Sequence, residues 1–213
     1  MSSLPEWTFP ETSTGNSYEF HLHNGFFEHV DAELTWSLVR QTRPRRVIEV
    51  GSGNTTLLLR AVLDRNAAQG FPGELLSIDP HPSPALRQAP PGLTDLNSDV
   101  LCECLQILPR LVPGVLIHFH DILTPFDYPE KYVMTNLCFW GEEYLLEAFL
   151  SFNAAFRVLW ASSAMQKFHD DILHEAFPAW QDSYARMPEE LRVFVPTLDG
   201  RDVWPCSLWI TRE

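Results

Sequence analysis

The sequence predicts an α/β fold in which a doubly wound, mostly parallel sheet carries helices on both faces. Short apolar runs alternate along the chain with segments of helical period, and this alternation is typical of parallel sheets. The apolar run over 46–50 leads through a glycine turn, Gly51 and Gly53, into the next helical segment. A turn of this kind stands at the ligand-binding edge of such sheets.

The chain starts with a segment of irregular composition. Ser, Thr, Asn, Pro and aromatic residues dominate 1–25, which predicts an irregular N-terminal arm followed by a single domain over 26–213. Apolar residues at helical spacing predict a helix over 26–42. Pro44 ends this helix, because proline disfavours helical geometry in the residue before it.

Two strands flank the second predicted helix. The first covers 46–50, and the helix follows over 55–66 until the loop Gly70–Gly73 ends it. The second strand covers 74–79 and ends in a carboxylate, Asp79. These elements form one β-α-β unit, which predicts that the two strands are parallel.

The second half of the chain continues the alternation. The predicted helices cover 98–111, 139–152 and 168–177, and the predicted strands cover 113–121, 156–161, 192–195 and 206–211. A closing strand of this kind is expected to run antiparallel to the others.

Composition limits the function classes. The chain has 213 residues, of which 45% are hydrophobic, and a net charge of −13. This size suits one domain with a sizeable core, and an acidic surface repels nucleic acid and anionic membranes. No apolar run is long enough for a transmembrane helix, and the first residues lack the features of a signal peptide. Four cysteines without metal-finger spacing are expected to be reduced core thiols, which predicts a cytoplasmic protein.

The glycine turn narrows the kind of ligand. A dinucleotide fingerprint needs a third glycine where Thr56 stands, and a phosphate loop needs Lys-Ser/Thr after the glycines. Glu49 lies two residues before Gly51, and a carboxylate there suits a ligand with a cation or hydroxyl groups. A plain strand-to-helix turn remains the alternative.

The run Glu-Val-Gly-Ser-Gly-Asn-Thr-Thr over 49–56 resembles the first motif of class I S-adenosylmethionine-dependent methyltransferases. Four further segments resemble the small-molecule enzymes of the methyltransferase 24 kind: 107–122 with its His-x-His-Asp ending, 124–129, 139–146 and 207–210. They follow in the family's order over nearly the whole chain. The resemblance implies a Rossmann-like sheet with S-adenosyl-L-methionine as cofactor.

The middle of the chain departs from that family. Only 35 residues separate Asp79 from Val115, whereas one β-α-β unit takes roughly 30 residues, so two strands of the usual fold are expected to be missing. The prediction is a truncated methyltransferase fold with strand order 2-1-3-5-4. In that order the strand over 47–50 lies directly beside the strand over 115–120.

The resemblance also implies a cofactor site. Glu49, Gly51 and Gly53 would hold the amino acid end of S-adenosyl-L-methionine. Asp79 would accept hydrogen bonds from the ribose hydroxyls, as a carboxylate can take both at once. For Asp79, turn capping remains the alternative.

His118, His120 and Asp121 end the third predicted strand. Two-residue periodicity directs both histidines to one face and Asp121 to the other. His120 and Asp121 are the predicted catalytic residues, with His120 as the base that removes a hydroxyl proton. His118 is favoured as a core histidine. A divalent metal on the two histidines is an alternative that the sequence does not favour, because the missing strands remove a third ligand.

The expected function is therefore O-methyl transfer from S-adenosyl-L-methionine to a small-molecule hydroxyl. The alternative is a degenerate methyltransferase fold that serves as a binding or interaction module without catalysis. A nicotinamide enzyme is less favoured, since the third fingerprint glycine is absent. The identity of the methyl acceptor and the formation of a homo-oligomer are left open.

Overall fold

The computed structural model describes residues 7–79, 102–135, 137, 140–178, 180, 197–198, 201–202 and 205–213. The chain divides into two compact units: unit 1 is Met1–Asp95 with Ala179–Pro188, and unit 2 is Leu96–Pro178 with Glu189–Glu213. Each unit has its own apolar core. The arm over 1–25 and the single domain over 26–213 stay predictions, although the described part of the arm contains no helix or strand.

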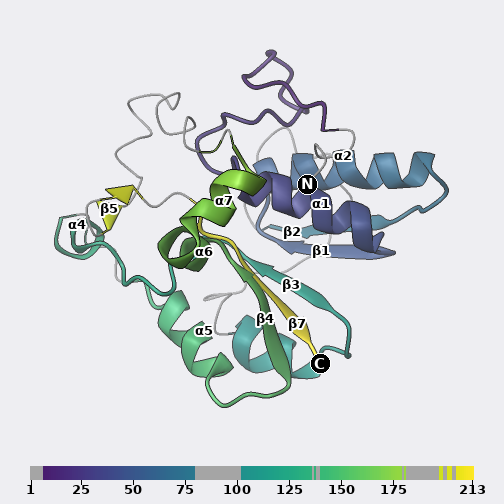
Figure 1. The fold of residues 1–213 in the computed structure, drawn as a ribbon. Helices are drawn as coiled ribbons and strands as arrows, with labels where there is room; N and C mark the ends of the chain where they lie inside the picture. The colour runs from purple at the N-terminus through teal and green to yellow at the C-terminus, as the bar shows by residue number, and fades with distance from the viewer. Residues whose placement is uncertain are drawn as a thin grey trace. The chain divides into compact units, whose positions relative to one another are not determined.

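Unit 1 is a parallel strand pair with two helices on one side of it (Figure 1). The order of its elements is α1 (Asp31–Thr42), β1 (Arg46–Val50), α2 (Asn54–Ala68) and β2 (Glu74–Ile78). The strands pair in parallel, from Arg46 opposite Glu74 to Val50 opposite Ile78. This confirms the predicted β-α-β unit.

The core of unit 1 fills the space between the helices and one face of the strand pair. Trp36 of α1 and Leu58 and Val62 of α2 are buried there, and Val47 and Leu75 pack against them from the strands. Ile48, Val50 and Leu76 of the same strands are exposed. Trp7 and Phe9 of the arm meet Trp36 edge to face, at ring-centroid distances of 5.9 and 5.2 Å.

The first helix begins later than predicted, at Asp31 instead of residue 26. The side chain of Asn24 accepts hydrogen bonds from the backbone N–H groups of Phe26 and Phe27, at 3.0 and 2.8 Å, which holds these residues in a turn. Val30 has a positive φ of 68°, which no helix accommodates. Local side-chain bonds therefore compete successfully with the helix.

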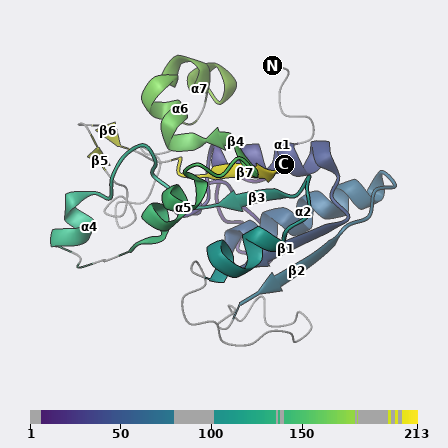
Figure 2. The same ribbon diagram turned by 90° about the horizontal axis from the view of Figure 1, so that it is seen from below.

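Unit 2 combines a three-stranded sheet with short helices (Figure 2). Its elements, in order, are η1 (a turn of π-helix, Glu103–Ile107), η2 (3₁₀, Leu108–Arg110), β3 (Leu116–Phe119), α4 (Glu130–Met134), α5 (Glu142–Leu150), β4 (Phe156–Ala161), α6 (Ser162–Phe168), α7 (Asp170–Ala176), β5 (Thr197–Leu198), β6 (Arg201–Asp202) and β7 (Leu208–Arg212). The small strands β5 and β6 pair with each other.

The closing strand β7 lies between β3 and β4 and runs antiparallel to both. Phe119 stands opposite Leu208 in one ladder, and Ala161 stands opposite Leu208 in the other. The fully buried Ile210 lies at the centre of the unit 2 core, with Leu146 from α5. The predicted antiparallel closing strand, placed between the third and fourth strands, is thus confirmed.

The doubly wound parallel sheet is the part of the prediction that needs correction. The α/β class holds, but β1 and β2 form a parallel pair in unit 1, whereas the ladders described in unit 2 are antiparallel, so the described strands are not mostly parallel. The predicted pairing of 47–50 with 115–120 would join the two units and stays a prediction. In the structure β7 supplies the hydrogen-bonding partner for β3 and β4, and each unit closes a core of its own.

Three helix predictions also changed. The start of the predicted helix over 98–111 lies outside the described residues. Its described part contains η1 and η2. Pro109, within η2, has no backbone N–H for an α-helical hydrogen bond. The helix over 139–152 shortens to α5, and the helix over 168–177 is replaced by α6 and α7, which His169 separates. The strand over 192–195 lies outside the described residues. No helix in the described part of the chain combines the length and apolar character needed to cross a membrane.

Candidate functional site

The glycine turn follows β1 and leads into α2. Gly51 has a φ of +85°, a conformation that residues with a side chain rarely adopt, and its N–H donates to the Ile78 carbonyl at 2.8 Å. Gly53 is extended, with a φ of 173°, so its backbone alone does not require glycine. A Cβ built on either residue would meet no atom within 4 Å. Both glycines therefore face open space at the end of the strand.

Glu49 and Asp79 flank this turn. The Oε2 atom of Glu49 accepts a hydrogen bond from the Thr56 hydroxyl at 2.7 Å, and the Ser77 hydroxyl lies 3.0 Å from the same atom. Asp79 accepts a hydrogen bond from the Ser52 hydroxyl. The four predicted cofactor residues thus meet at the carboxyl ends of β1 and β2, as expected for parallel neighbours.

The charge of Glu49 is sensitive to this environment. Burial raises the pKa of its carboxyl, and the nearby Asp79 carboxylate raises it further, while the hydrogen bonds from Thr56 and Ser77 oppose the shift. The net pKa lies above the ordinary value. A cation placed beside Glu49 would therefore relieve an unfavourable burial of charge.

The start of α2 completes this group. Gly53, the residue before the helix, has no side chain that could cap it. Its N–H donates to the Thr56 hydroxyl oxygen at 2.9 Å. The Asn54 side-chain amide donates to Asn24 Oδ1 at 3.0 Å, which ties the turn before α1 to the glycine turn. Asn24 was not predicted to belong to this group. The pair Asn24-Gly25 indicates a turn, but it does not indicate which residues lie next to that turn in space.

His118 lies inside the unit 2 sheet, in the environment of a core histidine. Its Nε2 is 2.8 Å from the Ser207 hydroxyl, and its ring stacks on Trp209 at 4.6 Å. Burial, together with the charge of His120, lowers its pKa to about 3. With Nε2 engaged by Ser207, the geometry gives no support to a metal bound jointly by His118 and His120.

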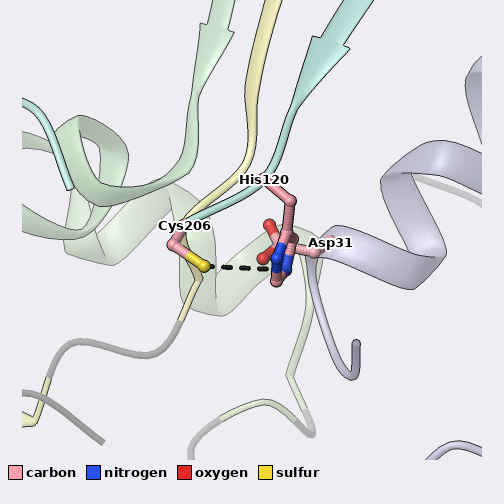
Figure 3. A group of neighbouring side chains, drawn as sticks. All are labelled: Asp31, His120 and Cys206. Atoms are coloured by element: carbon pink, nitrogen blue, oxygen red, sulfur yellow. Dashed lines mark hydrogen bonds between the residues drawn. The ribbon is translucent and has the colours of Figure 1, made fainter. Parts of the chain in front are cut away.

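His120 stands between a carboxylate and a thiol. Its Nδ1 is 3.2 Å from Asp121 Oδ1. Its Nε2 is 3.6 Å from Cys206 Sγ, the contact that Figure 3 marks with a dashed line. Cys206 Sγ is also 3.6 Å from Asp121 Oδ1. Asp31, which Figure 3 also draws, belongs to unit 1.

The predicted direction of Asp121 was wrong. Alternation along a strand would send its side chain to the face opposite His120, but β3 ends at Phe119 and Asp121 has a positive φ of 61°. This left-handed backbone, which aspartate tolerates better than most residues, brings the carboxylate beside the imidazole. The two predicted catalytic residues are therefore in contact.

Cys206 reaches this group through backbone pairing beyond the end of the β3–β7 ladder. The Ile122 N–H donates to the Cys206 carbonyl at 2.9 Å, and the Ser163 hydroxyl donates to the Pro205 carbonyl at 2.9 Å. Cys206 was predicted to be a core thiol, and it is buried. No local signal in the sequence links it to a histidine 86 residues away.

The two charges next to His120 decide its protonation. Burial disfavours the imidazolium, but the electrostatic influence of Cys206 and the hydrogen bonds with Asp121 and Cys206 outweigh it, so the pKa of His120 lies well above its usual range. The imidazolium is therefore the prevailing form near neutral pH.

A basic hollow of about 600 Å³ lies at the other end of the β1–β2 pair from the glycine turn. Arg43, Arg45 and Arg46 line it, and the Arg43 guanidinium lies 3.8 Å above the ring of Phe71. No role was predicted for these residues. The hollow does not include any predicted cofactor residue.

Comparisons with known proteins give little information on function. No family model matches the chain. An uncharacterised protein of Archaeoglobus fulgidus is 32% identical to it over 81 residues, which make up 38% of this chain and 36% of that protein. The match therefore covers well under half of the relative. No solved structure matches.

Proposed function

We propose that unit 1 binds S-adenosyl-L-methionine at the glycine turn and that the chain transfers its methyl group to a small-molecule hydroxyl. The observation that carries the proposal is the grouping of Glu49, Gly51, Gly53 and Asp79 at the carboxyl ends of two parallel strands, beside open space. Ligands bind at this edge of parallel sheets.

Each part of this group suits one part of the cofactor. The Glu49 carboxylate would neutralise the ammonium group of the methionine end, and the Asp79 carboxylate would accept hydrogen bonds from the ribose hydroxyls. The positive end of the α2 dipole favours the cofactor's carboxylate. Gly51 and Gly53 leave the space that a ligand needs next to the backbone.

His120 would act as the base. The acceptor oxygen attacks the methyl carbon as the bond from carbon to the sulfonium sulfur breaks, and the hydroxyl proton passes to His120. Only neutral imidazole can take that proton, and the pKa of His120 is raised. Turnover should therefore increase with pH above neutrality and not through the ordinary histidine range.

One observation favours the second candidate, a binding or interaction module without catalysis. His120, the proposed base, lies beside Cys206 and Asp121, and these contacts raise its pKa, which disfavours the neutral form that a base needs at neutral pH. A module would keep the glycine turn as a ligand site and would produce no S-adenosylhomocysteine.

The test is formation of S-adenosylhomocysteine from S-adenosylmethionine with a panel of small hydroxyl compounds, between pH 6 and 9. Methyl transfer that His120→Gln lowers by about 10²–10⁴-fold, with cofactor affinity retained, supports the enzyme. Cofactor binding without product at any pH supports the module. Full turnover by His120→Gln would exclude His120 as the base.

A further inference from the structure

Cys206 has no role in the proposed methyl transfer, yet it is part of an ordered group of three side chains in unit 2. The carboxylate of Asp121, the imidazole of His120 and the thiol of Cys206 follow one another at 3.2 and 3.6 Å. In this order the carboxylate can orient the imidazole, and the imidazole can take the proton of the thiol and so activate the sulfur as a nucleophile.

We propose that Cys206 is a nucleophilic thiolate, activated by His120, and that it is a modification site for small carbon electrophiles. The reaction is an alkylation. The thiolate sulfur attacks the electrophilic carbon, a sulfur–carbon bond forms, and the leaving group departs with its electron pair. The proton of the thiol has already moved to His120.

The backbone holds the two reacting groups in place. The β3–β7 ladder ends with Phe119 opposite Leu208, and the bond from the Ile122 N–H to the Cys206 carbonyl lies just beyond it. The Ser163 hydroxyl anchors the neighbouring Pro205 carbonyl. Sulfur and imidazole therefore need no rearrangement to meet, which preserves the activated form.

The charges around Cys206 act in opposite directions. The His120 imidazolium stabilises the thiolate, as nearby histidines do in reactive cysteines. The Asp121 carboxylate, 3.6 Å from the sulfur, opposes ionisation of the thiol, but its side chain is 87% exposed, so the surrounding water weakens this effect. His118, whose ring centre is 6.2 Å from that of His120, is kept neutral by its low pKa and adds no charge. The imidazolium therefore prevails.

Two other cysteines of unit 2 provide internal references. Cys104 is completely buried, and burial together with the charge of Glu103 raises its pKa to about 11, so it should stay inert. Cys102 is half-buried, and its Sγ faces the Gln106 side-chain oxygen at 3.7 Å instead of a histidine. Cys102 thus serves as the reference for a thiol without a histidine neighbour, and comparison of Cys206 in the wild type and in His120→Gln isolates the effect of His120.

Access limits the site to small reagents. Cys206 is itself buried, whereas the His120 side chain is 28% exposed. Iodoacetamide is therefore the suitable probe. The measurement is the alkylation rate of each cysteine in the full-length native chain, followed by peptide mass spectrometry from pH 5.5 to 9 without S-adenosylmethionine, so that its outcome does not depend on the proposed function.

At pH 6.5 we expect Cys206 to react at least about tenfold faster than Cys102, because an ordinary thiol of pKa about 8.5 is only about 1% ionised there. His120→Gln should remove this advantage. Equal rates for the two cysteines, no reaction at Cys206, or an unchanged rate in His120→Gln would overturn the proposal.

A second measurement does not depend on the histidine variant. Thiolate absorbance in the near ultraviolet is titrated in the wild type and in Cys206→Ser, and the difference reports Cys206 alone. We expect a midpoint well below about 8.5, the ordinary thiol value. A midpoint at or above that value would contradict the proposal even if His120→Gln failed to fold.

Discussion

Glu49 connects the electrostatics of unit 1 to the proposed cofactor. Its carboxylate is hydrogen-bonded by Thr56 and Ser77, yet burial and the nearby Asp79 raise its pKa. The ionised form is the one that attracts the ammonium group of the cofactor. Affinity for S-adenosylmethionine should therefore rise as the pH increases through the pKa of Glu49 and then level off.

Glu49→Gln tests this relation. Glutamine keeps a hydrogen-bond acceptor for Thr56 and Ser77 but carries no charge, so the fold should survive while affinity for the cofactor falls by about tenfold or more. Calorimetric titrations at pH 5 and 7.5 should show a strong pH dependence in the wild type and a weak one in the variant. Equal affinities of the two proteins at pH 7.5 would rule out the role of Glu49.

His118 should make unit 2 sensitive to acid. The pKa of His118 is about 3 in the folded chain and about 6.5 in the unfolded chain. Between about pH 3 and 6.5 the unfolded chain therefore binds a proton at this residue, whereas the folded chain does not. Stability is therefore lost as the pH decreases below about 6.5. Between pH 6.5 and 5 this loss should amount to at most about 2 kcal/mol.

Urea unfolding of the wild type and of His118→Gln at pH 6.5 and 5 measures this effect. The substitution itself should lower stability at both pH values, because it disrupts the contacts with Ser207 and Trp209. The stability difference between the two proteins should shrink at pH 5. A difference that stays constant would show that His118 titrates normally.

Strand β7 is the element on which unit 2 depends most. It supplies hydrogen bonds to both β3 and β4, and its Ile210 is fully buried in the core. Ile210→Ala should lower the free energy of unfolding by about 2–5 kcal/mol. Ile172 on α7 is 49% exposed. Ile172→Ala should therefore change the free energy of unfolding by no more than about 0.5 kcal/mol. Chemical denaturation of both variants provides the comparison, and similar losses in the two would refute the central position of β7.

The elements themselves could largely be predicted, because each leaves a local pattern. The apolar runs over 46–50 and 156–161 became β1 and β4 with these boundaries. The start of α1 was missed because Asn24 and the positive φ of Val30 act through specific bonds and angles that periodicity does not record. The place of the closing strand between the third and fourth strands was also predicted, and β7 takes it.

The residues of the candidate site also differ in whether their positions could be predicted from the sequence. Glu49 and Asp79 could be brought together from the sequence, because the carboxyl ends of neighbouring parallel strands meet at one edge. Cys206 was not singled out, because its place beside His120 depends on contacts beyond the end of the β3–β7 ladder that no local pattern records. Asp121 was identified as a candidate, but its direction depends on a single backbone angle.

The molecule as a whole carries its proposed functional groups in both units. Glu49, Gly51, Gly53 and Asp79 belong to unit 1, whereas His118, His120, Asp121 and Cys206 belong to unit 2. The net charge of −13 disfavours a polyanionic partner and suits a cationic sulfonium ligand. Cofactor binding to unit 1 is therefore the first requirement of the proposed function, and the chemistry at His120 is the second.

Calorimetric titration with S-adenosylhomocysteine and S-adenosylmethionine tests the first requirement most directly, using two glycine variants. Gly51 and Gly70 have nearly the same positive φ, +85° and +88°, and a Cβ on either meets no atom within 4 Å, but only Gly51 lies in the proposed site. Valine at either position therefore causes similar backbone strain. We expect the wild type and Gly70→Val to bind and Gly51→Val to show no binding. Absence of binding heat in the wild type at millimolar ligand, or equal binding by both variants, would contradict the account.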